Sequence, residues 1–391
     1  FRRYIIMKKF SQSPLDQSFI QNPYPAYEIA RNLGDVVWWE DYNMSAAVSY
    51  RAVRMILSNR NLGVQALVPP QCPAHLTEWQ ANESDSMLAL EPPRHKRLRG
   101  LVLRAFTAKT VASTADDIRA TCHQLIDKFP SKPFDFLNYF ARPLPVQIIA
   151  TLLGVPTEKC DDLLRWSNAM VAMYQSKRSY EIELAANKAT IDFTEFLESY
   201  ITHRRKNPRS DLLSDLIAAE EAGQKLTGAE LISTCILLLN AGHEATVHTL
   251  GNALNTLLPT CHRSINSELI EEVLRYDPPL HVFTRFAYED IDCFGFKIDK
   301  GQEVACVLAS ANRDPAFLEN PNKFDPLRKP GQHQSFGAGI HFCVGAPLAR
   351  LEITLGLETL FERLPNLKIA SPASYGDTYH FHGLKSLMLE Y

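Results

Sequence analysis

A cysteine near the C-terminal end of the chain lies in surroundings that suit a metal-bound thiolate. The stretch FGAGIHFCVG, residues 336–345, places Cys343 among three glycines, which let a backbone turn tightly and approach a ligand closely. Amides in such a loop can spread the negative charge of a thiolate, and Phe336 can keep water from the sulfur. The next residues, APLARLEITLGLETLFERL, are typical of a helix whose first turn would bring positive dipole to the sulfur. Cys343 is therefore a candidate metal ligand.

These ten residues resemble the haem-binding loop of the cytochrome P-450 superfamily, the haem-thiolate monooxygenases, at every defined position. The resemblance implies that the Cys343 thiolate is the axial iron ligand of haem b, iron protoporphyrin IX, and promotes O–O cleavage. It also implies haem contacts for Phe336, Gly337 and Gly345. The alternative for an isolated cysteine is a buried, inert thiol in a glycine-rich turn. A match over ten positions favours the haem ligand.

A second stretch, EPPRHKRLRG, carries basic side chains on a predicted helix. His95 and Arg99 are four residues apart and therefore share one helix face. The resemblance implies that they bind the haem propionates together with Arg285, on a later strand, and His341, in the cysteine loop. Two buried carboxylates need such donors because an unpaired buried charge is costly. The alternative is a solvated basic face.

The longest predicted helix covers residues 227–258 and would be roughly 48 Å long. Thr227 and Glu230 form a capping-box pattern, and the helix is apolar on nearly every face, so it should be buried. Its centre, AGHEAT, resembles the oxygen-binding segment of the family. The resemblance implies that Ala241 and Gly242 make room for O₂ beside the haem, and that Glu244 helps to deliver protons. We also expect Gly242 to allow a local widening of the helix.

This segment departs from the family pattern at the residue after the acid, where Ala245 replaces the usual threonine. Thr246 is one residue late and should point about 100° away. Three substitutes for the hydroxyl remain open: a hydroxyl on the substrate, a water ordered by the helix, or Thr246 brought inward by distortion. We place the ordered water and the substrate hydroxyl first. The alternative is that Ala245 marks a slow or uncoupled enzyme.

A pair of charged residues, Glu272 and Arg275, lies one turn apart on the next predicted helix. The family resemblance implies a buried pair behind the haem, completed by Arg328. A surface ion pair of little energetic value is the alternative. The stretch from Ala245 to Glu272 is short for the family, which suggests that one connecting helix is trimmed or missing from this sequence.

The substrate pocket can be placed only by analogy with the family. For Met170, ordinary helix core is an equally good interpretation. The residues implied are Met87, Leu88, Met170, Leu237, His281, Val282, Phe283 and Phe381.

The predicted fold is mainly α with a small β region, with haem between the long central helix and the Cys343 loop. We expect strands at residues 36–39 and 46–49, further strands between 283 and 308, and a final hairpin with its tip near Phe381. Residues 61–90 lack periodicity and are expected to form an irregular stretch, either a functional lid or a mobile loop. The family resemblance implies that this region covers the substrate. We treat residues 1–391 as one domain, in which residues 1–6, before Met7, are interpreted as an upstream extension or as non-native.

Composition narrows the class of protein. The net charge of −3 favours neither nucleic acid nor a membrane surface as partner, and 46% hydrophobic residues indicate a globular protein. The eight cysteines form no CxxC pair, so zinc and iron–sulfur sites have no support. No apolar run near the N-terminus is long enough for a signal peptide or membrane anchor, which resembles the soluble bacterial branch of the family. We therefore expect a monomer in the cytoplasm.

The resemblance implies a monooxygenase that inserts one oxygen atom from O₂ into a small, apolar organic substrate. Electrons would come from NAD(P)H through a separate ferredoxin or flavodoxin-type donor and its reductase, because the chain has no flavin or iron–sulfur segment. A docking face near Arg97, Arg104 and Arg350 is expected. Two other classes remain open: a haem-thiolate peroxygenase or isomerase that needs no redox chain, and a non-catalytic haem- or ligand-binding protein.

Overall fold

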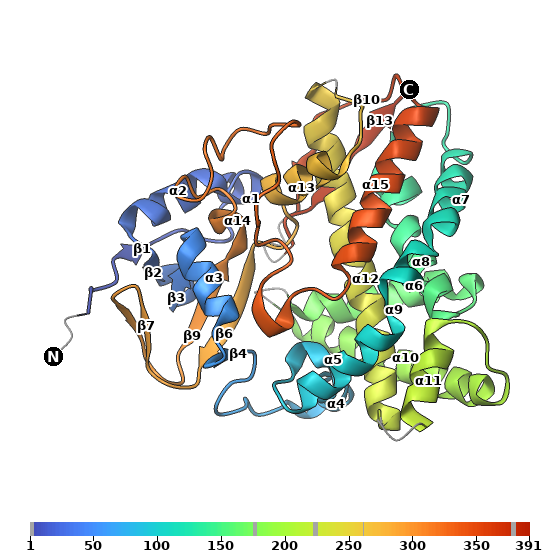
Figure 1. Ribbon diagram of the computed structural model, residues 1–391, viewed down its shortest axis with the longest axis horizontal. Coiled ribbons are helices and arrows are strands. Elements are labelled where there is room, and N and C mark those ends of the chain that lie inside the picture. Colours follow the sequence, from blue (N-terminus) through green and yellow to red (C-terminus); the bar gives the residue numbers. More distant parts are fainter. Residues whose placement is uncertain (1–3, 175–177, 222–225, 261, 377–380) are drawn as a thin grey trace.

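The computed structural model describes residues 4–174, 178–221, 226–260, 262–376 and 381–391. Helices make up one side of the molecule and the largest sheet lies on the other, with the long helix α12 running through the centre (Figure 1). The predicted class, mainly α with a small β region, is confirmed. The helices are α1 Gln17–Gln21, α2 Tyr24–Leu33, α3 Tyr50–Ser58, α4 Thr77–Ser84, α5 Arg94–Ala105, α6 Ala108–Ala112, α7 Ala115–Ile126, α8 Pro143–Leu153, α9 Cys160–Val171, α10 Tyr180–Lys206, α11 Leu212–Glu221, α12 Gly228–Leu257, α13 Ser267–Tyr276, α14 Leu308–Ala311 and α15 Ala346–Arg363.

The main sheet has six strands in the order β1-β2-β3-β9-β6-β4. Strand β6 runs antiparallel to β9 with Arg285 opposite Val304, which fixes the position of the Arg285 side chain. The strands are β1 Lys9–Phe10, β2 Val36–Trp39, β3 Met44–Ala47, β4 Leu62–Gly63, β5 Phe134–Asp135, β6 Val282–Ala287, β7 Ile291–Cys293, β8 Phe296–Ile298, β9 Glu303–Val307, β10 Lys368–Ile369, β11 Ser374–Tyr375, β12 Leu384–Ser386 and β13 Met388–Glu390.

Helix α12 agrees closely with the prediction. It contains 30 residues, and Thr227 and Glu230 form the expected capping box, each accepting a hydrogen bond from the other's backbone N–H. Most of its side chains are buried, because α8, α9 and α15 pack around it. The expected widening at Gly242 is wrong, since the α-helix is continuous there. Gly242 instead allows close approach of α8, because a Cβ at this position would lie 3.1 Å from Ile149.

Two further expectations need correction. The strand predicted at 46–49 is Met44–Ala47, because the Ser49 hydroxyl already accepts a hydrogen bond from Ala52 N and caps α3. Residues 61–90 are not wholly irregular, since they contain α4. This helix is stabilised by contacts from elsewhere: Asn187 Oδ1 accepts hydrogen bonds from Glu78 N and Trp79 N, at 3.1 and 3.0 Å.

The final hairpin is present as the antiparallel pair β11 and β12. Residues 377–380, which the prediction placed next to its tip, lie outside the described residues, whereas Phe381 is described and bridges to Leu280. The connection between α12 and α13 is short, as the sequence suggested: Leu257 and Ser267 are the bounding residues. Among the described helices, none combines the length and the apolarity that crossing a membrane requires.

Candidate active site

The loop before α15 holds Cys343 in the predicted setting. Cys343 N donates a hydrogen bond to Phe336 O, at 3.0 Å, which closes the loop on itself. The amides of Gly345 and Ala346 donate hydrogen bonds to the cysteine sulfur at the start of α15. Burial raises the pKa of Cys343, while these amides and the nearby Arg99 and Arg350 act in the opposite direction. The donors favour a thiolate, which is the form that binds a metal.

Glycine is required in this loop at one position in particular. Gly339 has a φ of +71°, in the left-handed region. A Cβ there would also collide with the carbonyl oxygen of Leu57, at the end of α3. The loop can therefore approach α3 only because residue 339 has no side chain.

Helix α12 has an accessible stripe halfway along an otherwise buried surface. Ala241 is exposed, and Leu237, Glu244, Ala245 and His248 are half-buried. Of the residues between them, Leu238, Asn240 and Gly242 are also half-buried and the other four are buried. The spacing of three and four residues places these positions on one helix face. Space beside one face of an interior helix is what a bound cofactor and substrate require.

Two imidazoles hold Glu244 on this stripe. Glu244 Oε1 is 3.1 Å from His248 Nε2, and Oε2 is 3.3 Å from His243 Nε2. Burial raises the pKa of Glu244, but the hydrogen bonds from His243 and His248 outweigh it and hold the pKa well below its ordinary value. Glu244 is thus an ionised carboxylate at the accessible face.

The hydroxyls near Ala245 are turned away from the stripe. Thr246 is 4% exposed, as its place in the helix predicts. The Thr249 hydroxyl donates a hydrogen bond to Ala245 O, at 2.7 Å. Neither Thr246 nor Thr249 replaces the hydroxyl that Ala245 lacks.

The four candidate propionate ligands lie around the Cys343 loop. The rings of His95 and His341 are 4.2 Å apart, and Arg99 donates a hydrogen bond to Phe342 O, at 2.5 Å. Arg285 is 6% exposed, and no carboxylate among the described residues forms an ion pair with it. His341 pairs with Glu91, at 3.2 Å.

These donors fit the group that the resemblance implies. His95 Nε2 is buried and has no hydrogen-bond partner among the described residues. Burial, with the charges of His341 and Arg99, lowers the pKa of His95 to about 4. A buried guanidinium without a carboxylate and an orphaned imidazole nitrogen are what anionic propionates would satisfy. The residues present therefore fit haem.

The charged residues that were predicted to pair, Glu272, Arg275 and Arg328, lie together in the structure. Glu272 Oε2 is 2.7 Å from Arg275 Nε, and Glu272 Oε1 is 3.2 Å from Arg328 Nε. Arg275 donates further hydrogen bonds to the carbonyl oxygens of Asn312 and Pro321, at 3.0 and 2.8 Å. The group joins α13 to the long segment before the Cys343 loop.

The residues assigned to the substrate pocket do not all face one space. Leu88 and Leu237 are accessible, and the Phe381 ring is 5.7 Å from that of His248, beside the accessible stripe. Val282 and Phe283 are half-buried on β6. The remaining three are buried: Met87 and Met170 in the main hydrophobic core, and His281 in a polar cluster.

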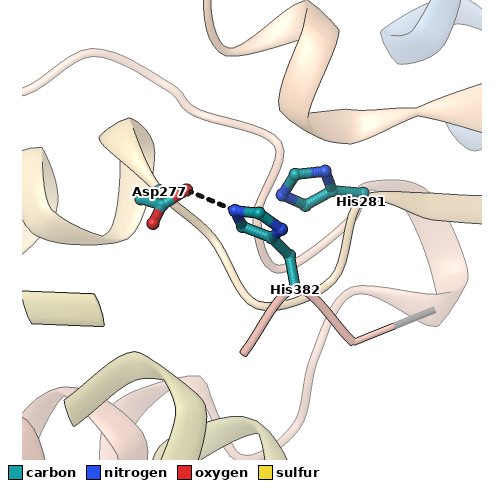
Figure 2. Close-up of side chains that lie close together, drawn as sticks. All are labelled: Asp277, His281 and His382. Atoms are coloured by element: carbon teal, nitrogen blue, oxygen red, sulfur yellow. Dashed lines mark ion pairs between the residues drawn. The ribbon is translucent and has the colours of Figure 1, made fainter. Parts of the chain in front are cut away.

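That polar cluster contains Asp277, His281 and His382, whose ligand atoms lie within 4.8 Å of one another (Figure 2). It is the one group of three potential metal ligands among the described residues. However, Asp277 already accepts hydrogen bonds from the hydroxyls of Tyr24 and Tyr375, at 2.6 and 2.5 Å, and lies 3.4 Å from His382 Nε2.

A positive charge is also present beside the cluster. The Arg313 guanidinium stacks on the Tyr24 ring, at 3.3 Å, and contributes to the lowered pKa values of His281 and His382, for which burial is the main cause. A second cation would be repelled, so we interpret the cluster as a hydrogen-bonded network. Asp277, His382 and His248 were not predicted from the sequence, although the four-residue spacing of Glu244 and His248 places the two on one helix face.

The expected basic docking face is partly neutralised. Arg97 Nη2 is 2.5 Å from Glu230, and Arg350 Nε is 2.5 Å from Glu271. In the Cys343 loop, Ile340 and Phe342 are exposed, at 37% and 40%, and Leu103 on α5 is exposed at 46%. The face is therefore more apolar and less charged than the sequence suggested.

Comparisons with known proteins agree with this geometry. The family model "Cytochrome P450" matches residues 28–263 and 262–369. The two matches meet in the short connection between α12 and α13. The chain is 33% identical to the putative cytochrome P-450 YjiB of Bacillus subtilis (strain 168), over 94% of each chain. It is also 33% identical to the biotin biosynthesis cytochrome P-450 of the same organism, over 96% of this chain and 98% of the relative.

Two solved structures show the same fold. The crystal structure of P-450 BioI in complex with an acyl carrier protein ligated to hexadec-9Z-enoic acid has a TM-score of 0.90 and 32% identity, covering 96% of this chain and 100% of that chain. The structure of the bacillaene polyketide synthase P-450 PksS of Bacillus subtilis 168 has a TM-score of 0.85 and 32% identity, covering 97% and 99%. The chain therefore belongs to the cytochrome P-450 family of haem-dependent monooxygenases.

Proposed function

We propose that Cys343 binds the haem iron and that Arg285, Arg99, His95 and His341 hold the propionates. The observation that carries this proposal is the pair of amide donors, from Gly345 and Ala346, on the Cys343 sulfur. The buried Arg285 guanidinium, which has no carboxylate partner among the described residues, and the unpartnered Nε2 of His95 support the propionate assignment. Phe336, Gly337 and Gly345 are proposed to shape the loop against the cofactor.

When bound, haem supplies the oxidising centre that transfers one oxygen atom of O₂ to the substrate. The protein's own residues would then stabilise the sulfur, leave space on α12 and hold a proton. The amides of Gly345 and Ala346 stabilise the sulfur anion, and the small side chain of Ala241 leaves space on α12. Glu244, held ionised on the same stripe, can accept a proton and release it at its carboxyl oxygens.

We propose that the electrons come from NAD(P)H through a separate ferredoxin or flavodoxin-type protein. The exposed side chains of Ile340 and Phe342 lie in the cysteine loop and support a docking surface there. Arg97 and Arg350 form ion pairs with Glu230 and Glu271. They would therefore help to orient the electron-donor protein more than attract it by net charge. We also propose that the whole chain acts as one domain and as a monomer.

The substrate that we propose is a small, mainly apolar organic molecule. The accessible side chains Leu88, Leu237 and Phe381 support an apolar pocket wall. Among relatives, one is named for biotin biosynthesis, and the P-450 BioI structure holds an acyl chain. Long-chain fatty acids are therefore the first compounds to test, by following the haem absorption change on binding.

The decisive experiment concerns the thiolate ligand. A thiolate shifts the absorption band of the reduced carbon-monoxide complex strongly to the red, so the parent protein should show this band. Cys343→His should bind haem and lose the band. Cys72→Ala, at a half-exposed cysteine outside the site, is the matched control and should retain it. A red-shifted band in Cys343→His would mean that another cysteine is the ligand.

A further inference from the structure

The accessible stripe of α12 carries two side chains that can exchange a proton, Glu244 and His248. Ala245, beside Glu244, has no hydroxyl. Thr246 is 4% exposed, and the Thr249 hydroxyl is bound to Ala245 O. Within residues 241–249, all of which are described, neither threonine hydroxyl lies on the stripe beside Glu244, whereas the imidazole of His248 does.

The geometry of His248 suits proton transfer to Glu244. The two residues are one helical turn apart, and His248 Nε2 lies 3.1 Å from Glu244 Oε1. This is hydrogen-bond distance, as a direct transfer requires. The second carboxyl oxygen is occupied by His243, whose side chain is 1% exposed, so His248 is the more accessible of the two partners.

The other nitrogen of His248 faces the C-terminal segment. His248 Nδ1 is buried and has no hydrogen-bond partner among the described residues. A Cβ on Gly383 would collide with Nδ1, so only glycine lets the backbone cross here. Asn252, one turn further along α12, donates a hydrogen bond to His382 O, at 2.9 Å, and holds this segment against the helix.

Behind Gly383 lies the polar cluster of Figure 2. The charge of His248 contributes to the lowered pKa of His382, for which burial is the main cause, and His382 Nε2 is 3.4 Å from Asp277. The groups that face His248 are therefore Glu244 on its own helix and His382 on the C-terminal segment. Asp277, in turn, binds the hydroxyls of Tyr24 and Tyr375, which are both half-buried.

We propose that His248 is a proton-relay residue for Glu244, in place of the hydroxyl that Ala245 lacks. The inference rests on the monooxygenase function, in which substrate, O₂, NAD(P)H and a proton give hydroxylated substrate, water and NAD(P)⁺. In the relay step the Nε2–H bond of the imidazolium breaks and an O–H bond forms at Glu244 Oε1. The imidazole is left neutral, with its remaining proton on Nδ1, and takes up a proton from solvent at Nε2. The O–H bond at Glu244 then breaks, and its proton goes to the oxygen atom that is released as water.

The competing explanation is that His248 only positions Glu244. His248→Gln separates the two roles, because a glutamine amide can donate a hydrogen bond to Glu244 but cannot carry a proton. His248→Ala removes both functions. The relay predicts that product formed per NAD(P)H consumed falls about tenfold or more in both variants, while O₂ consumption continues. Parent-like coupling in His248→Gln would overturn the relay.

Turnover with hydrogen peroxide provides an internal comparison, because peroxide brings its own protons with the oxygen. Peroxide-driven product formation should stay within about twofold of the parent in His248→Gln. An equal loss by both routes would show general damage to the site and overturn the proposal. His203→Gln, an exposed histidine on α10, is the matched control and should leave the coupling unchanged.

A measurement without turnover tests the contact itself. The infrared band of the protonated Glu244 carboxyl, assigned by its loss in Glu244→Gln, should appear at higher pH in His248→Ala than in the parent. An unchanged midpoint would contradict the contact on which the relay depends. The red-shifted carbon-monoxide band should persist in every His248 variant, and its absence in the parent would instead contradict the haem-thiolate assignment.

Discussion

Two half-buried carboxyl groups near α12 have opposite pKa shifts because they have different partners. Glu244 is bound by two imidazoles, which outweigh the effect of burial. Glu83, on α4, has neutral partners: the Tyr174 hydroxyl donates to Glu83 Oε2, at 3.3 Å. Burial raises the pKa of Glu83 to about 7. Only charge or strong donors make an enclosed carboxylate favourable.

The pKa of Glu83 gives a prediction about stability. The folded protein keeps this proton up to about pH 7, whereas the unfolded chain releases it near the ordinary value of 4.5. The contribution of Glu83 to stability therefore declines as pH rises through this window. Relative to the parent, Glu83→Gln should gain on the order of 2 kcal/mol in free energy of unfolding between about pH 5 and about pH 8.

Urea unfolding at the two pH values measures this difference. Glu78→Gln, at an exposed acid of the same helix, is the matched control and should change stability equally at both pH values. A constant difference between Glu83→Gln and the parent across the range would show that the Glu83 carboxyl is ionised in the folded protein throughout.

At the scale of elements, the Cys343 loop is held where it is by its approach to α3. Gly339 combines a φ of +71° with a backbone contact that excludes any Cβ. Gly339→Ala should therefore lower the free energy of unfolding by roughly 1–3 kcal/mol from backbone strain alone and reduce haem content. Chemical unfolding and the ratio of haem to protein absorption measure the two effects.

The control for this loop variant is Gly228→Ala, at the first residue of α12. A Cβ at Gly228 would meet no atom within 4 Å. This variant should stay within about 0.5 kcal/mol of the parent and retain full haem content. Equal behaviour of Gly339→Ala and Gly228→Ala would contradict the described path of the loop.

At the scale of the molecule, a buried charged group connects segments far apart in the sequence. Glu272 binds Arg275 and Arg328, and Arg275 also binds the carbonyl oxygens of Asn312 and Pro321. Removing the acid leaves a buried guanidinium without its counter-charge. Glu272→Ala should therefore cost roughly 3–5 kcal/mol in free energy of unfolding, measured by urea titration.

A surface pair provides the comparison. Glu390 pairs with Lys368 at 3.0 Å, and both side chains are exposed. Glu390→Ala should cost less than about 1 kcal/mol, because exposed ion pairs contribute little. If Glu272→Ala were as mild as Glu390→Ala, the group on α13 would not hold the molecule together.

Local patterns were sufficient to predict several parts of this protein. The capping box and apolar length of α12, the helix face shared by His95 and Arg99, and the glycine-rich setting of Cys343 depend on residues close in sequence. The position of Thr246, buried and pointing away from the accessible stripe, also followed from helix geometry alone. Such features are encoded locally because helix caps, helix faces and tight turns involve neighbouring residues.

Other features were decided by contacts between distant segments. Helix α4 has little periodicity of its own and depends on Asn187, more than a hundred residues away. Gly242 packs against Ile149 on α8 instead of widening α12, and His281 enters a cluster with His382 from the C-terminal segment. Sequence spacing cannot predict these pairs, because the burial and the partners that set their chemistry exist only once the segments pack together.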